Sequence, residues 1–288
     1  MSGAAPSRWR DVGRRFWRQP GAKIATGVLC TVVFLAAFGP WLSPHAVDQI
    51  DFDADWSQSP TLVNSHWFGT DSLGRDLFVR TLEGGRVSLA IGLAATLLSL
   101  VVGVAWGAVA GYRGGRLDAL LMRTVDVLYA LPFVFLVMLL MAIFGREPWL
   151  MLAAIAAVSW LDLARISRGQ ALALRGQDFI AAARLAGLGS SDIVRRHVIP
   201  NLLGVVAVYG TLMVPQVILL ESFLSFLGLG VQEPATSWGV LVSDGAREME
   251  EAPWSLLFPA GFLALTLYAF NALGDALRDA LDPRGSGW

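Results

Sequence analysis

The stretch SLAIGLAATLLSLVVGVAWGAVA, residues 88–110, decides the class of this protein. It carries no charged residue and is long enough to cross a bilayer, whose hydrocarbon core of about 30 Å requires roughly 20 apolar residues in a helix. The rest of the 288-residue chain has the same character, because 55% of its residues are hydrophobic and only 16% are charged. The sequence therefore predicts an all-α membrane protein.

Six stretches approach the length of a transmembrane helix. The predicted spans are residues 22–42, 88–110, 125–144, 149–163, 202–226 and 254–273. The fourth is the shortest and carries Asp162 at its end. The first follows a basic tail, residues 1–21, as a signal peptide would, but Gly39-Pro40-Trp41 is a poor cleavage site, so we interpret it as a retained span.

The distribution of basic residues predicts the orientation, because Lys and Arg accumulate in cytoplasmic loops. Seventeen of the 22 basic residues fall in the N-terminal tail, the second and fourth connections and the C-terminal tail, and five fall on the opposite side. Both termini are therefore expected in the cytoplasm. The long connection 165–201 is then cytoplasmic, and residues 43–87 form an external loop that is partly ordered against the membrane surface.

Several kinds of chemistry are excluded by composition. Lys23 is the only lysine and precedes Ile24, so the chain has no Gly-Lys-Ser/Thr sequence for a phosphate-binding loop. Cys30 is the only cysteine, which rules out an intrachain disulfide. The net charge of −1, without a basic stripe, argues against a nucleic-acid partner. Any energy that the protein needs must therefore come from a partner or an ion gradient, and no cofactor is expected on this chain.

The cytoplasmic connection predicts two short helices separated by a glycine turn. Residues 178–187 place four side chains on one helical face at i, i+3, i+4 and i+7 spacing: Phe179, Ala182, Ala183 and Ala186. Gly187 and Gly189 end this helix, and Ser190 or Ser191 is expected to cap a second helix over 192–198 that ends at Pro200. A face of small residues suits docking into a partner's groove, or equally a connector packed on its own bundle.

Other residues give expectations about the spans. Gly103, Gly107 and Gly111 form a small-residue ridge for packing against an internal helix or a partner. Asp126 is expected to pair with Arg123 near the cytoplasmic end of its span. Three prolines are expected to interrupt spans three, five and six: Pro132, Pro215 and Pro259.

The sequence offers few polar candidates for a translocation pathway. These are Gln216, Glu221 and Asn271. Glu221 lies near the outer end of span five, where an ionisable residue is by default a functional hypothesis. The three histidines, His45, His66 and His197, are isolated in the sequence and have no paired metal-ligand spacing.

Three classes of function remain open at this point. The first is a permease coupled to separate ATPases, and the second is an ion-driven secondary transporter, which would be expected to show internal repeats and mid-span carboxylates. The third is an intramembrane enzyme, which would need paired catalytic groups within the spans. The absence of repeats and of a central Asp or Glu, together with the cytoplasmic helix–turn–helix, favours the first.

The cytoplasmic connection also carries a family resemblance. Ala181-Ala182-Ala183, Gly187 and, ten positions later, His197-Val198-Ile199-Pro200-Asn201 resemble the EAA loop of bacterial ABC importer permeases. The spacing matches, but Ala181 stands where the family often has Glu, so an ionic contact from that position is not implied. The resemblance implies that this loop docks in a cleft of an ATPase subunit. The residues it assigns to docking are Phe179, Ala181, Ala182, Ala183, Gly187, His197 and Pro200.

Four further motifs resemble the dipeptide/oligopeptide group of these permeases, C-type subunit. They are His66–Asp76, Arg123–Asp126 with Leu131-Pro132, Glu221–Gly230 with Ser237–Gly239, and Asn271–Pro283. The resemblance implies a type I ABC importer transmembrane domain with a permease core over 88–284, in a bacterial inner membrane.

The implied partners are a homologous second permease, two ATPases that bind ATP and Mg, and a periplasmic or lipoprotein solute-binding protein. The implied substrates are di- or oligopeptides, with nickel chelates or glutathione as alternatives within the family.

Overall fold

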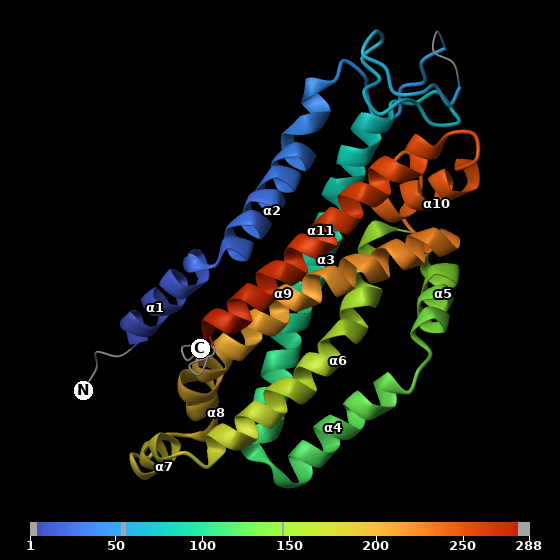
Figure 1. Cartoon of the computed structure of the whole chain (residues 1–288). Coiled ribbons are helices and arrows are strands. Elements are labelled where there is room, and N and C mark those ends of the chain that lie inside the picture. The colour runs from blue at the N-terminus through green and yellow to red at the C-terminus, as the bar shows by residue number, and fades with distance from the viewer. Residues whose placement is uncertain (1–4, 53–55, 146, 282–288) are drawn as a thin grey trace.

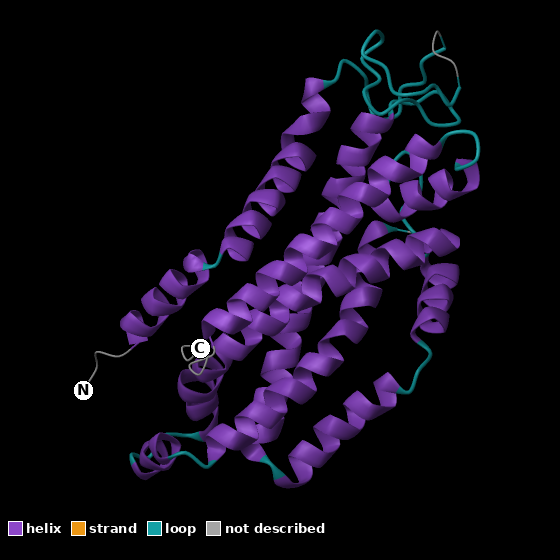
Figure 2. Ribbon diagram, in the orientation of Figure 1, coloured by secondary structure: helices purple, strands orange, loops and turns teal. Residues whose placement is uncertain are grey.

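The computed structural model describes residues 5–52, 56–145 and 147–281, and over these residues the chain is helical without any strand (Figure 2). The first half contains α1 (Ala5–Arg18), α2 (Pro20–Phe38), a 3-10 turn η1 (Gly39–Leu42), α3 (Leu77–Arg113), α4 (Gly115–Tyr129) and α5 (Phe133–Phe144). The second half contains α6 (Pro148–Arg175), α7 (Asp178–Leu185), α8 (Ser190–Ile193), the π-helical segment η2 (Val194–Val198), α9 (Ile199–Leu224), a second such segment η3 (Ser225–Leu229), α10 (Trp238–Glu248) and α11 (Pro253–Leu281).

The long helices run side by side as one bundle with two distinct ends (Figure 1). One end holds α1, α7, α8 and the last turns of α11, and the other holds the loop after α2 together with α10. Among the described residues, five helices are long and apolar enough to span a membrane, and the α4–α5 pair makes six if it forms one span. The prediction of an all-α membrane protein is confirmed.

Span two is longer than the hydropathy pattern indicated. α3 begins at Leu77 rather than at residue 88, because the Asp76 carboxylate caps it by accepting a hydrogen bond from the Val79 N–H at 2.8 Å. The charged residues of the added turns are paired, as Arg86 is with Glu83. The 37 residues extend roughly 55 Å, so α3 projects beyond the hydrocarbon core.

Span three is not the continuous helix that was predicted over 125–144. α4 and α5 meet at an angle of 77° across a break at residues 130–132. Pro132 lacks an N–H and disfavours helical backbone at the residue before it, which explains why the helix ends here. Pro215 and Pro259, in contrast, lie inside the continuous helices α9 and α11, so the predicted interruptions at those two positions are wrong.

Span four also continues past its predicted end at residue 163. α6 is a 28-residue helix that ends at Arg175, which places Asp162 near its middle. Hydropathy failed here because the arginines of the cytoplasmic half have partners on α4. Arg168 binds Asp118 through two hydrogen bonds of 2.6 and 2.7 Å, and Arg165 binds Asp126 at 2.9 Å. The expected pair between Asp126 and Arg123 is therefore wrong.

The glycine ridge of α3 packs against an internal helix, α6. A Cβ at Gly103, Gly107 or Gly111 would lie less than 3.0 Å from a carbonyl oxygen of α6, contributed by Trp160, Ala164 or Arg168 respectively. Within a membrane, small residues are what allow two backbones to approach this closely. The α3–α6 contact is the most extensive between any two helices in the described ranges.

We predict that Gly107→Leu destabilises the protein, because its side chain would collide with the backbone of α6. Overpacking costs about 1–3 kcal/mol, which for a chain of 288 residues corresponds to a melting temperature lowered by roughly 2–5 °C. Thermal unfolding of the detergent-purified protein measures this shift. Gly27→Leu is the matched control, since Gly27 on α2 has open space at its Cβ position. Equal shifts in the two variants would contradict the packing argument.

Candidate functional site

The connection 165–201, predicted to be cytoplasmic, presents an apolar surface on α7. Ile180 and Ala183 are buried and face the bundle, whereas Phe179 is 41% and Leu185 is 90% exposed. Ala181, Ala182 and Ala186 are exposed as well. The predicted face is thus correct except for Ala183, which packs inward. Sequence analysis missed Leu185, although its exposed apolar side chain lies on the same short helix.

A Schellman motif ends α7 at Gly187. The Gly187 N–H donates to the Arg184 carbonyl (3.0 Å) and the Leu188 N–H donates to the Ala183 carbonyl (3.2 Å). Gly187 has φ +81°, a conformation that side chains disfavour. The expected helix break is confirmed. The expected serine cap is wrong, because Gly189 occupies the N-cap position and makes no side-chain cap bond.

The second arm of this connection is the beginning of the next span. α8, η2 and α9 form one helix through Pro200, which lies in the first turn of α9 rather than at a helix end. The chain widens to a π-helix just before this proline, which avoids the clash that a proline causes in a regular α-helix. The predicted separate helix over 192–198 is therefore wrong.

Two side-chain contacts fix α7 to its neighbours. The Arg184 Nε donates to the hydroxyl of Tyr112 at 3.2 Å, at the end of α3. The rings of Phe179 and His197 lie with their centroids 6.5 Å apart, which joins α7 to η2. The cytoplasmic connection is consequently a firmly attached element whose outer face is apolar.

A cavity of about 550 Å³ lies where the α4–α5 bend meets α6 and α9. Most of its wall is apolar. The polar side chains that line it are Tyr129, Ser159, Asp162, Tyr209 and Gln216. Gln216, a predicted pathway residue, is therefore part of a cavity wall.

The other two predicted pathway residues do not line this cavity. Glu221 is fully buried and accepts hydrogen bonds from the hydroxyls of Ser88 (2.9 Å) and Ser225 (2.8 Å), so it joins α3 to η3. Asn271 is exposed on α11 and donates to the Leu267 carbonyl of its own helix at 2.9 Å. The pathway role of these two residues therefore stays a prediction.

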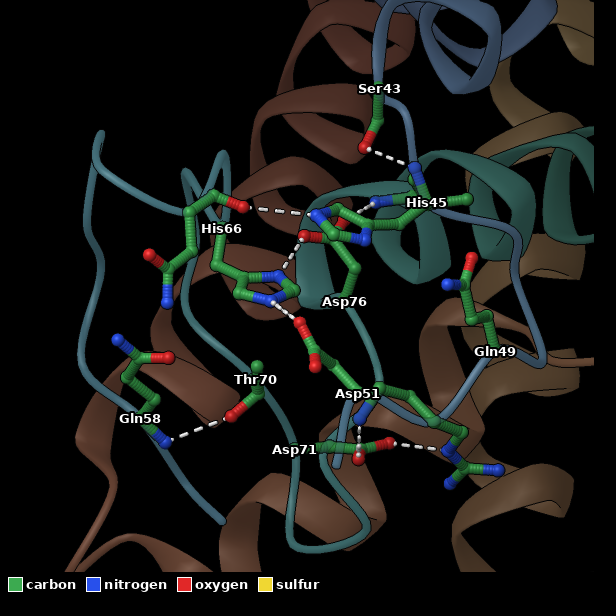
Figure 3. A network of polar contacts seen from close by, with 12 residues as sticks. Ser43, His45, Gln49, Asp51, Gln58, His66, Thr70, Asp71 and Asp76 are labelled. Atoms are coloured by element: carbon green, nitrogen blue, oxygen red, sulfur yellow. Dashed lines mark hydrogen bonds and ion pairs between the residues drawn. The ribbon is translucent and has the colours of Figure 1, made fainter. Parts of the chain in front are cut away.

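The loop at the opposite end is folded around His66, as Figure 3 shows. The His66 Nδ1 lies 2.8 Å from the Asp76 carboxylate, and the Nε2 lies 3.2 Å from that of Asp51. His45 stacks on the His66 ring with centroids 4.2 Å apart. His45 and His66 therefore lie together, although their sequence spacing gave no sign of it.

This cluster has a poor geometry for a metal ion. Ligand atoms of His45, Asp51 and His66 lie within 4.8 Å of one another. However, the two rings are stacked at an interplanar angle of 17°, and one ion cannot lie in the planes of two stacked rings. The contacts of His66 and the capping role of Asp76 explain the cluster as the structural centre of the loop.

Arg75 connects the same loop to the segment before α10. It donates to Asp71 and to Glu233, with both distances 2.7 Å. The hydrogen bond from Arg75 lowers the pKa of the Glu233 carboxyl from its ordinary value. Asp244 of α10 lies in the same region, and burial raises its pKa. The outer loop is thus tied to α10 by charged groups.

Comparison with known proteins identifies the family. Residues 103–286 match the binding-protein-dependent transport system inner membrane component family, and residues 7–60 match the N-terminal TM domain of oligopeptide transport permease C. Oligopeptide transport system permease protein OppC of Escherichia coli K12 is 52% identical over 96% of this chain and 92% of the relative. The protein of the same name from Haemophilus influenzae is 49% identical over 96% of this chain and 89% of the relative. Dipeptide transport system permease protein DppC of Bacillus subtilis is 43% identical over 96% of this chain and 85% of the relative.

These matches cover both the first span and the remaining bundle, so they account for the whole helical fold described above. They confirm the expected type I ABC importer transmembrane domain. The chain belongs to the binding-protein-dependent transport system inner membrane components, as a permease of the oligopeptide transport permease C type.

Proposed function

We propose that this chain is one of two membrane-spanning permeases of an ATP-driven peptide importer. A homologous permease completes the pathway, two ATPases bind ATP and Mg on the cytoplasmic side, and a solute-binding protein delivers the peptide from outside. The chain itself binds no cofactor. The observation that carries this proposal is the exposed apolar face of α7 on a cytoplasmic connection that is built into the bundle.

The apolar face of α7 supports docking rather than a connector packed on its own bundle. Leu185 is 90% exposed, and Phe179, Ala181 and Ala182 lie on the same exposed side. An exposed apolar patch at the aqueous end of a membrane protein marks an interaction site. Small side chains around two large apolar ones suit insertion into a cleft of an ATPase. Gly187 ends this helix and the His197 ring contacts Phe179. Ala183 and Pro200 are the remaining residues that we assign to the docking element.

The same connection provides a mechanical route from the ATPases to the pathway. Movement of α7 acts on the helix that begins at Ser190, and this helix continues to Leu227, before the kink at Gly228. Gln216, on the cavity wall, is 26 residues along it from Ser190, or roughly 39 Å at 1.5 Å per residue. Rotation of a stiff helix of this length transmits a small displacement of the loop to the cavity.

The relatives support a peptide as the substrate, since their names describe oligopeptide and dipeptide transport. Nickel chelates and glutathione remain the alternative substrates within this family. An ion-driven secondary transporter is the alternative mechanism, and the position of Asp162 near the middle of α6 is the observation in its favour.

Energy dependence separates the two mechanisms. In proteoliposomes that contain the assembled complex, uptake should require ATP and should persist when an ionophore collapses the ion gradients. The ATPases supply the energy, so no gradient is needed. Uptake without ATP that stops on addition of the ionophore would establish the secondary-transport alternative.

Leu185→Asp tests the docking surface. The side chain is exposed, so the substitution leaves the fold intact, but a charge in an apolar interface should weaken ATPase association by about 30-fold or more. Co-purification of the ATPases with the tagged permease measures this loss. Leu62→Asp, at an 84% exposed position of the outer loop, is the matched control and should retain them. Undiminished ATPase recovery with Leu185→Asp would refute the assignment.

We place the protein in the inner membrane of a bacterial cell, with both termini in the cytoplasm. In a Cys30→Ser background, which removes the only cysteine, Ser59→Cys should react with an impermeant maleimide in intact spheroplasts. Ser190→Cys should react only after permeabilisation. Both positions are exposed, so access to the reagent decides the labelling. The opposite labelling pattern would invert the topology.

A further inference from the structure

The cavity beside the α4–α5 bend contains a single charged side chain. Its polar wall residues other than Asp162 are uncharged, and the remainder are apolar, as Leu128, Phe133 and Met213 illustrate. Asp162 lies near the middle of the 28-residue helix α6, and its side chain is exposed and lines this cavity. Ionisable residues within membrane-spanning helices occur mainly where they serve a substrate or ion pathway.

Asp162 has no partner within the part of the chain that the structure describes. Its carboxylate makes neither a hydrogen bond nor an ion pair there. The nearest basic residue along the helix is Arg165, at the i+3 position, which would be expected to pair with it. Arg165 instead binds Asp126 at 2.9 Å and lies over the Tyr129 ring, 4.5 Å from its centroid.

We infer that Asp162 binds the amino-terminal ammonium group of the peptide during passage through the membrane, an inference that rests on the proposed function. A carboxylate in an apolar wall is complementary to one cationic group, and a charge-assisted hydrogen bond between the two is stronger than a neutral one. The α-ammonium is the cationic group that peptides of different sequence share. The apolar wall contributes no side-chain-specific polar contact, which suits a carrier of varied peptides.

The neighbouring polar groups fit the rest of a peptide terminus. Gln216 is exposed on the cavity wall and carries both an amide donor and an acceptor, and the Tyr209 hydroxyl can do either. The Ser159 hydroxyl is already used, because it donates to the Ile155 carbonyl at 2.8 Å. Gln216 and Tyr209 of α9 therefore face Asp162 of α6 across a cavity of about 550 Å³, a volume within the range of ligand pockets.

The test compares a peptide with its des-amino analogue, in which hydrogen replaces the terminal amine. Uptake is measured in ATP-driven proteoliposomes with binding protein saturated by each compound, for the wild type and Asp162→Asn. We expect Asp162→Asn to lower kcat for the free-amine peptide about tenfold to hundredfold, the range of a charge-assisted hydrogen bond. Uptake of the analogue should be slow in the wild type and unchanged in the variant.

Direct binding of the two compounds to the purified complex without ATP provides a second measurement. It does not require the solute-binding protein to deliver the compound. Asp162→Asn should remove the preference for the free amine, and Asp162→Glu should keep part of it. Asp275→Asn, at an exposed position of α11 that does not line the cavity, should retain it fully. Equal effects of Asp162→Asn on both compounds would overturn the inference. So would loss of the second permease from the purified complex, since that result would identify Asp162 as half of an ion pair between subunits.

The same assay separates this inference from the proposed function. If the wild type takes up neither compound and binds neither, the peptide importer itself is refuted together with the inference. If the wild type transports the peptide with ATP but Asp162→Asn shows no selectivity for the amine, only the role of Asp162 is refuted.

Discussion

The close approach of α3 to α6 is the contact on which the rest of the structure depends. Lipid removes the hydrophobic driving force between helices, so dispersion packing decides which backbones meet. Gly103, Gly107 and Gly111 leave one face of α3 without side chains, and the carbonyls of α6 lie against it. This contact between α3 and α6 extends toward the end of α6 that carries Arg165 and Arg168. It therefore determines where these arginines meet α4.

Those arginines determine the shape of the cavity. Arg165 and Arg168 hold α4 against α6 through Asp126 and Asp118, whereas the break at Pro132 directs α5 away at 77°. Residues from both sides of the bend, Leu128 and Phe133, line the cavity. One set of ion pairs thus extends α6 past the apolar region and also opens a space beside it. The residues of α9 that line the cavity belong to the helix that begins at Ser190, directly after the Gly187 turn.

Hydropathy predicted the helical class and the approximate spans, because each span needs a long apolar run. It misplaced the ends wherever a charge has a partner distant in sequence. The predicted spans began at residue 88, after Arg86, and ended at residue 163, after Asp162. However, Arg86 donates to the Ala36 carbonyl of α2, and α6 continues through its contacts with α4. The Gly187 turn was predictable because its cause is local. Two other features depend on tertiary contacts that no local sequence pattern contains. These are the hydrogen bond from Ser88 to the buried Glu221 and the stacking of His45 on His66.

The misplaced end of span four has a functional consequence. A span that stops at residue 163 places Asp162 at an interface, where a carboxylate is solvated and needs no explanation. The helix that reaches Arg175 places it in the middle of α6 beside a cavity, with Arg165 engaged elsewhere. A protein that only needed to fold would gain from an apolar residue at this position or from pairing Asp162 with Arg165. A carboxylate kept unpaired within the chain is instead the arrangement expected when its cationic partner arrives with the transported substrate.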